Sequence, residues 1–141
     1  MNGLLFPSQG SQTVGMGKEL YESLPVAKEL LDKADDVLGY DLKALIFNGP
    51  QEQLTDTRYA QPAIYTVSAM YLEKVKADGL SYDYVAGHSL GEYDALLAAG
   101  VYNFETGLKL VAARGEAMGK MNGKGTMAAV MGLSEDELTE Y

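Results

Sequence analysis

The sequence predicts an α/β fold with a largely parallel sheet. Short apolar runs that are typical of strands alternate with longer segments of helical periodicity, and glycines and prolines mark the boundaries between them. A length of 141 residues suits one domain with a real core, and a hydrophobic content of 47% with 22% charged residues is typical of a folded globular chain.

The first strand is expected over Gly3–Pro7, because this apolar run ends in Ser-Gln-Gly. Helices are expected over Met16–Leu24 and over Pro25–Leu38, where a proline occupies the first turn and Gly39 ends the helix. Residues 41–61 are predicted to form a long connection, since they contain the turn signature Asn-Gly-Pro.

A further helix is expected to open at Pro62 and to end at the Ala-Asp-Gly of residues 77–79. Its apolar positions recur at helical spacing. They are Ile64, Val67, Tyr71 and Val75. Tyr82–Ala86 is predicted to be the second strand.

Two more helices are predicted over Leu90–Ala99 and Phe104–Met118, and a short strand over Thr126–Met131 follows a glycine-rich segment. Ser134 and Glu137 have the spacing of a capping box, which predicts the start of another helix. The chain ends about one turn later, so we expect the domain to be incomplete.

Composition argues against several classes of function. No apolar run approaches the roughly 20 residues of a membrane span, and the N-terminus lacks the pattern of a signal peptide. Without cysteine and with one histidine, a metal site is not expected, and the lack of disulfides suits the cytoplasm. A net charge of −9 argues against a nucleic-acid partner.

Ser89 lies in the sequence Gly-His-Ser-Leu-Gly between a predicted strand and a predicted helix, which is the nucleophile-elbow pattern. Reversing the chain in so few residues strains the serine backbone, while Gly87 and Gly91 allow neighbouring segments to approach. The hydroxyl would then stand over a helix N-terminus, where the Leu90 N–H can stabilise an oxyanion. The alternative is a glycine-rich turn that only packs tightly.

His88 is the only histidine of the chain and adjoins Ser89. Adjacent side chains at a strand end point to opposite faces, whereas a general base must come within about 2.6–3.2 Å of the hydroxyl. We therefore expect His88 to steady the elbow by packing or hydrogen bonding, which leaves Ser89 without a base. Most tyrosines, Tyr93 among them, are interpreted as core or rim packing.

Four segments resemble, in the same order, the motifs of the acyltransferase family, which includes malonyl-CoA:acyl-carrier-protein transacylases and polyketide-synthase acyltransferase domains. They are "LLFPSQGSQTVGMGKELY", "TRYAQPAIYTVSAMYLE", "VAGHSLGEYDALLAAGVYNFETGLKLVAARGEAMG" and "GTMAAVMGLSEDEL". The resemblance covers essentially the whole chain and matches the N-terminal half of the family's domain. It implies part of an α/β-hydrolase-like core over residues 1–124 and the truncated start of a small ferredoxin-like subdomain over residues 125–141.

The resemblance implies transfer of a malonyl group from coenzyme A, through a serine ester, to the phosphopantetheine thiol of an acyl carrier protein. This reaction serves fatty-acid or polyketide biosynthesis, with malonyl-CoA as substrate and no cofactor. Ser89 matches the nucleophile, and the backbone N–H groups of Gln9 and Leu90 match the oxyanion donors. Ser8 departs from the family's usual glycine but leaves the Gln9 donor in place.

Arg114 lies about 60° from the helical stripe formed by Phe104, Val111 and Met118. An arginine that points partly toward the core needs an anionic partner, unless its side chain extends to solvent. The partner is either a substrate carboxylate or an acidic residue of the chain. The resemblance places the malonyl carboxylate on Arg114 and matches Gln61 to a pocket-lining glutamine.

The family's general-base histidine aligns beyond Tyr141, so the 141-residue chain alone is expected to be incomplete and nearly inactive. The missing part would be a further segment or a separate chain. Two alternatives stay open. One is an acyl hydrolase of the same family that removes acyl groups from carrier proteins, although Arg114 argues against it. The other is a non-catalytic fragment that binds acyl groups or a carrier protein.

Overall fold

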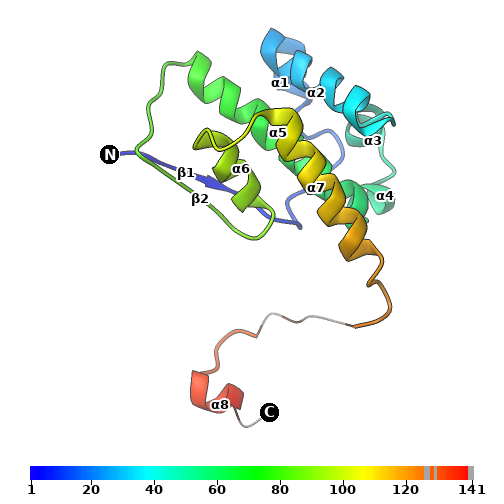
Figure 1. Cartoon of the computed structure of the whole chain (residues 1–141), viewed down its shortest axis with the longest axis vertical. Coiled ribbons are helices and arrows are strands. Elements are labelled where there is room, and N and C mark those ends of the chain that lie inside the picture. Colours follow the sequence, from blue (N-terminus) through cyan, green and yellow to red (C-terminus); the bar gives the residue numbers. More distant parts are fainter. Residues whose placement is uncertain (126–127, 129, 140–141) are drawn as a thin grey trace.

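The computed structural model describes residues 1–125, 128 and 130–139, and its α/β architecture confirms the predicted fold class (Figure 1). The sheet is small and parallel. Strand β1 (Gly3–Phe6) pairs with strand β2 (Tyr84–Gly87), with Gly3 opposite Tyr84 and Phe6 opposite Gly87. Helix α6 (Gly91–Ala98) packs on both strands. The carboxyl ends of the strands therefore lie side by side, next to the start of α6.

The helices that the sequence predicts are present, and their ends differ from the prediction by five residues or fewer. They are α1 (Lys18–Ser23), α2 (Pro25–Leu38), α5 (Thr57–Ala77), α6, α7 (Phe104–Gly119) and α8 (Glu135–Thr139). Gly39 ends α2 at a φ of 75°, which a glycine adopts without strain. The capping box of α8 also forms, because the Glu137 carboxylate accepts a hydrogen bond from the Ser134 backbone N–H at 2.8 Å.

The prediction of a long connection over residues 41–61 is wrong. Helices α3 (Leu42–Asn48) and α4 (Gln51–Thr55) occupy most of it, and α5 already begins at Thr57. Asp41 makes α3 possible, because its carboxylate accepts a hydrogen bond from the Ala44 N–H at 2.7 Å. The Asn-Gly-Pro sequence lies at the junction of these two short helices.

Pro62 does not open α5 but lies within it. The helix starts earlier because Asp56 caps it, accepting a hydrogen bond from the Arg58 N–H at 3.0 Å. Pro62 has no N–H, so one hydrogen bond to the Arg58 carbonyl is lost near the start of this long helix. The packing of the helix offsets this loss. Of the strand predicted over Thr126–Met131, residues 126, 127 and 129 lie outside the described residues, and the described residues of this segment are not in a strand.

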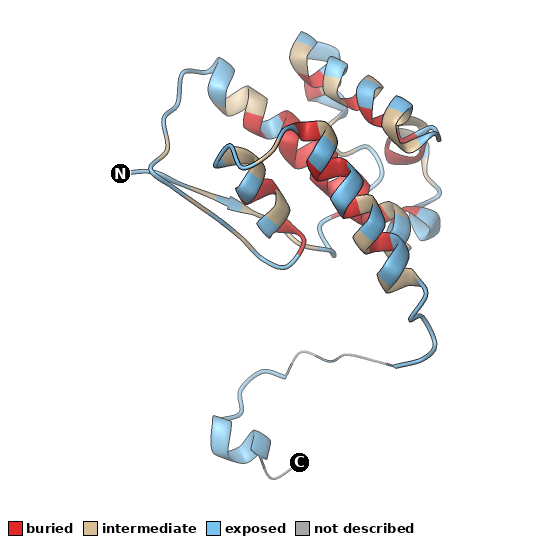
Figure 2. Ribbon diagram, viewed as in Figure 1, coloured by how far each residue is buried: buried red, intermediate tan, exposed pale blue. Residues whose placement is uncertain are grey.

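Helix α5 is the centre of the core, with α2 and α7 packed against it (Figure 2). Its residues from Ala60 to Met70 are all buried, as expected of a helix surrounded by other elements. The Tyr65 ring stacks on Phe104 with a centroid separation of 5.6 Å, and its hydroxyl donates to the Phe104 carbonyl at 3.1 Å. This contact fixes the start of α7 against the middle of α5.

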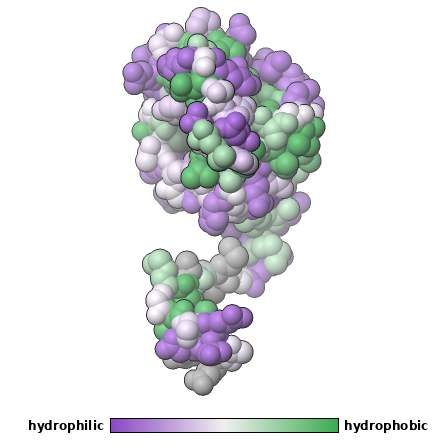
Figure 3. All heavy atoms as spheres, turned by 90° about the vertical axis from the view of Figure 1, so that its left-hand side faces the viewer, coloured by the Kyte–Doolittle hydropathy of each residue, from purple (hydrophilic) through white to green (hydrophobic). Residues whose placement is uncertain are grey.

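An apolar groove of about 390 Å³ runs between β1 and α5. Its lining includes Leu4, Phe6, Val67, Tyr71 and Val75. Large apolar side chains are also exposed on the strands, and hydrophobic patches interrupt the hydrophilic surface in Figure 3. Parallel sheets normally have both faces covered. Among the described residues, no helix is both long and apolar enough to cross a membrane.

Candidate active site

The turn between β2 and α6 has the backbone geometry of a nucleophile elbow. Ser89 adopts a φ of 52° and is the one non-glycine residue with positive φ in the described part of the chain. This left-handed conformation is strained for a serine and persists only where the surrounding structure enforces it. The strain expected from the sequence at Ser89 is therefore present.

Two glycines make this turn sterically possible. A Cβ atom on Gly87 would lie 2.0 Å from the Gly91 carbonyl carbon, and one on Gly91 would lie 2.3 Å from the Phe6 carbonyl oxygen. Both obstacles are backbone atoms, which cannot swing away as a flexible side chain can. Glycine at both positions therefore lets the start of α6 pack against the carboxyl end of β1.

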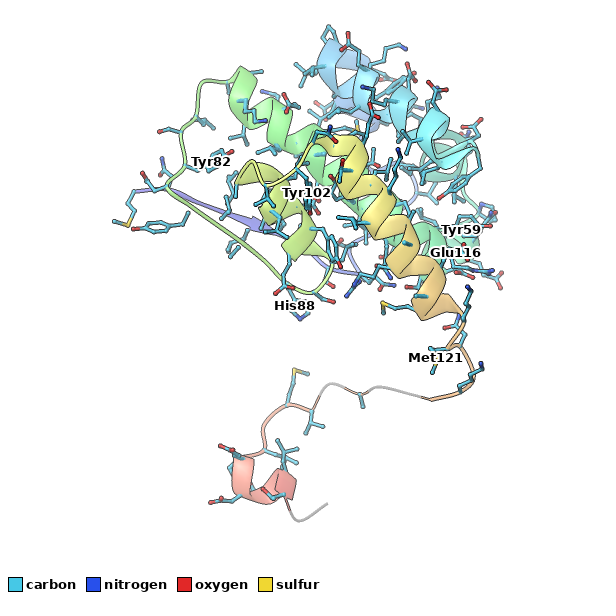
Figure 4. The ribbon with its side chains drawn as sticks, in the orientation of Figure 1. Tyr59, Tyr82, His88, Tyr102, Glu116 and Met121 are labelled. Carbon is cyan, nitrogen blue, oxygen red and sulfur yellow. The ribbon has the colours of Figure 1, made fainter. Side chains whose placement is uncertain are left out.

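His88 contributes to the elbow through its main chain. Its N–H donates to the Phe6 carbonyl at 3.3 Å, and its carbonyl accepts from the Gly91 N–H at 2.9 Å. The imidazole is exposed and projects away from the helices (Figure 4). The expected steadying role is thus carried by backbone hydrogen bonds rather than by packing of the side chain.

Arg114, on α7, hydrogen-bonds to two other residues that the sequence analysis singled out, Ser89 and Gln61. Its Nη2 donates to the Ser89 Oγ at 2.9 Å, and its Nη1 donates to the Gln61 Oε1 at 2.6 Å. The Gln61 side chain is fully buried, and its Nε2 donates to the Thr57 hydroxyl at 2.8 Å and contacts the Met118 sulfur at 3.3 Å. These contacts turn the amide oxygen of Gln61 toward the guanidinium.

Tyr93 supplies a contact that the sequence analysis missed. The Arg114 guanidinium carbon lies 5.7 Å from the centre of the Tyr93 ring, within the range of a cation–π interaction. The Tyr93 carbonyl accepts a hydrogen bond from the Tyr102 hydroxyl at 2.6 Å. The available signal was spacing, since Tyr93 lies one helical turn after Ser89, and residues four apart share a helix face.

Gln9 lies in the turn that follows β1. The Gly10 N–H donates to the Gln12 Oε1 at 2.8 Å, and the Gln51 side chain donates to the Gln12 carbonyl at 3.3 Å, so polar side chains hold this loop. Within the described residues, neither the Gln9 N–H nor the Leu90 N–H donates a hydrogen bond. The assignment of these two N–H groups as oxyanion donors stays a prediction.

No general base is paired with Ser89 in the described part of the chain. The one hydrogen bond of its hydroxyl there comes from Arg114, and no carboxylate or imidazole contacts it. The described residues also contain no cluster of three or more histidine, aspartate or glutamate side chains that could hold a metal ion. Among the described residues, the site thus contains a strained serine, two backbone N–H groups without a hydrogen-bond partner and a guanidinium.

Asp94 is a second feature that the sequence analysis did not identify. It follows Leu90 by one turn on the buried face of α6, and both of its carboxylate oxygens are buried without a hydrogen-bond partner in the described residues. Burial raises the pKa of the Asp94 carboxyl to about 9, with the result that the folded protein holds it neutral at pH 7.

Asp94 should therefore make stability depend on pH. Because the folded pKa lies above the unfolded value, the Asp94 contribution to the free energy of unfolding falls as pH rises from about 4 to about 9. We expect Asp94→Asn to be more stable than the parent by about 4 kcal/mol at pH 7 and to lose this advantage near pH 4. Urea unfolding of both proteins at several pH values measures the difference, and a constant difference would contradict the buried neutral acid.

A strained serine over a helix N-terminus, two free backbone donors and an adjacent guanidinium define the class of the site. It suits acyl transfer through a serine ester, with a place for a negative group beside the reacting carbon. The comparisons with known proteins agree. The family model described as "Acyl transferase domain" matches residues 4–140, and the chain belongs to this family.

Similar proteins are malonyl transacylases. The chain is 51% identical over 138 residues to the malonyl CoA-acyl carrier protein transacylase of Bacillus subtilis, covering 96% of this chain and 44% of that protein. It matches the crystal structure of the same enzyme from Clostridium perfringens with a TM-score of 0.86 and 36% identity, over 98% of this chain and 44% of that one.

A third match, with a TM-score of 0.79 and 42% identity, is a malonyl-transacylase in complex with a type II polyketide-synthase acyl-carrier protein; it covers 84% of this chain and 38% of that one. The chain thus spans less than half the length of these relatives.

Proposed function

We propose that this chain forms the nucleophile and carboxylate-binding part of a transferase that moves a malonyl group from coenzyme A to an acyl carrier protein. One observation carries the proposal, which is the 2.9 Å contact between Arg114 Nη2 and Ser89 Oγ. In malonyl-CoA a single methylene separates the thioester carbonyl from the free carboxylate. A cation adjacent to the nucleophile can therefore bind that carboxylate while Ser89 reaches the carbonyl carbon.

The reaction takes two balanced steps. The Ser89 oxygen bonds to the thioester carbon, the carbon–sulfur bond breaks, and coenzyme A leaves as the thiol. The thiol of the carrier's phosphopantetheine then attacks the ester, and the Ser89 hydroxyl is restored. In each step the N–H groups of Gln9 and Leu90 stabilise the tetrahedral oxyanion. In the first step a base outside the described residues takes the Ser89 proton and returns it to the coenzyme A sulfur; in the second it takes the proton of the phosphopantetheine thiol and returns it to the Ser89 oxygen.

The carrier-protein partner is proposed from a relative, because a similar malonyl-transacylase has been captured in complex with its acyl-carrier protein. The assignment of the chain to subdomains is also a proposal. We infer that residues 1–124 form part of an α/β-hydrolase-like core and that residues 125–141 begin a ferredoxin-like subdomain. The uncovered groove beside β1 supports the first assignment, since a two-stranded parallel sheet is marginal by itself.

The substitution Arg114→Ala tests the malonyl assignment. A mixture of malonyl-CoA and acetyl-CoA is offered to the protein that carries this chain, together with a carrier protein, and the acylated carrier is followed by mass. We expect malonyl transfer to fall about 100-fold, because a charge-assisted carboxylate contact is lost, while acetyl transfer changes little. Arg58→Ala is the matched control, since Arg58 also stacks on a tyrosine but pairs with Asp56.

Other outcomes would favour the alternatives. Release of free acid without carrier loading would indicate an acyl hydrolase. Binding of the carrier protein without loading of either acyl group would indicate a non-catalytic binding fragment. Equal loss of malonyl and acetyl transfer in Arg114→Ala would contradict carboxylate recognition by Arg114.

A further inference from the structure

We propose that Tyr93 is a positioning residue that sets the preference for acyl groups bearing a carboxylate. The proposal rests on the function proposed above and identifies what holds its carboxylate-binding arginine. The Tyr93 ring is a platform for the Arg114 guanidinium, and Tyr93 acts on the substrate only through that group.

The guanidinium is held from three directions. Gln61 accepts a hydrogen bond from Nη1 at 2.6 Å, Ser89 accepts one from Nη2 at 2.9 Å, and the ring of Tyr93 lies 5.7 Å from the guanidinium carbon. Arginine carries five N–H donors, and these two bonds leave the others for a substrate carboxylate. An aromatic face attracts the cation without consuming any donor. Tyr93 therefore restrains Arg114 and keeps its remaining N–H groups free.

Tyr93 and Gln61, which contact Arg114, are themselves held in place by other residues. The Tyr102 hydroxyl donates to the Tyr93 carbonyl at 2.6 Å, and buried neighbours in α6 fix the helix against the core. Gln61 is fully buried and held by Thr57 and Met118. The ring of Tyr93 is half-buried, and its hydroxyl makes no hydrogen bond within the described residues. The contribution of Tyr93 to Arg114 thus comes from the ring face.

Removal of the ring should weaken carboxylate recognition selectively. Arg114 is long and only half-buried, so without the platform it gains other rotamers that leave the site. An acetyl group has no carboxylate for Arg114 to bind. For Tyr93→Leu we expect the KM for malonyl-CoA to rise about five- to tenfold, with the KM for acetyl-CoA unchanged and little change in kcat.

The test compares steady-state transfer from the two thioesters by the protein that carries this chain. Tyr93→Phe keeps the ring face and should retain the parent preference for malonyl-CoA. Tyr59→Leu is the matched control, because the Arg58 guanidinium carbon lies 5.8 Å from the Tyr59 ring in an equivalent stack that is not linked to Ser89. If Tyr93→Leu does not fold, Tyr93→Met removes the ring while keeping much of the apolar volume.

The outcomes separate this inference from the proposed function. If the parent protein shows no preference for malonyl-CoA, the proposed function itself is contradicted. A parent that prefers malonyl-CoA, with Tyr93→Leu or Tyr93→Met retaining the full preference, would overturn only the role of Tyr93. Loss of preference in Tyr93→Phe to the same extent as in Tyr93→Leu would also overturn it, because the hydroxyl and not the ring face would then be responsible.

Discussion

Replacement of Ser89 by alanine is expected to lower acyl transfer by about 10⁴-fold or more, since only the oxyanion donors and substrate binding would remain. The His88→Ala variant is expected to lose less than about tenfold, because an essential general base contributes about 10²–10⁴-fold. The structure gives the reason for this difference. Ser89 contacts Arg114 at the elbow, whereas the His88 imidazole is exposed and its main chain makes the supporting hydrogen bonds.

Initial rates of carrier-protein acylation measure both variants, and thermal unfolding shows whether each is folded. Equal, nearly complete loss of activity in folded Ser89→Ala and His88→Ala would show that His88 is the base. A folded Ser89→Ala variant with substantial transfer would remove the nucleophile assignment.

The substitution Gly91→Ala is expected to have the second largest effect, on stability and activity together. The added Cβ would meet the carbonyl oxygens of Phe6 at 2.3 Å and Pro7 at 2.8 Å, so the backbone must move. We expect a loss of about 3 kcal/mol in the free energy of unfolding, at the upper end of the range for overpacking. The displaced segment leads directly into the loop of Gln9, so an oxyanion donor moves as well, which is worth about 10²–10³-fold in kcat.

Gly3→Ala is the control for this substitution. A Cβ on Gly3 would have its nearest neighbour, the Tyr84 carbonyl oxygen, at 3.8 Å, which is ordinary contact. Urea unfolding and kcat are measured for both variants. If Gly91→Ala behaved like Gly3→Ala in both measurements, the close packing of the elbow against β1 would not be needed for the site.

The elbow could be predicted from sequence because its cause is local. A serine between two glycines, after an apolar run and before a helix, specifies a strained turn, and the structure places Ser89 at a φ of 52°. Periodicity also placed Arg114 at the flank of its helix, and the resemblance to known acyltransferases joined it to Ser89. The structure then brought Arg114, Gln61 and Ser89 into contact.

Features that depend on tertiary contact could not be predicted in this way. Tyr93 and Asp94 are adjacent in α6, yet one supports an arginine from another helix and the other is a buried neutral acid. The spacing of four residues could place Tyr93 on the helix face of Ser89, but its contact with Arg114 and the burial of Asp94 depend on how other helices pack. The helices within residues 41–61 have a different cause. Asn-Gly-Pro is typical of a loop, but the carboxylates of Asp41 and Asp56 cap α3 and α5 on either side of it.

The most direct test of the central claim is to trap the acyl-enzyme. The protein that carries this chain is incubated with malonyl-CoA or with acetyl-CoA in the absence of carrier protein, quenched in acid, digested and mapped by mass. We predict a malonyl ester on the peptide containing Ser89, formed faster than any acetyl ester and absent from Ser89→Ala. A malonyl group on another residue, or carrier loading with no ester at Ser89, would contradict the account.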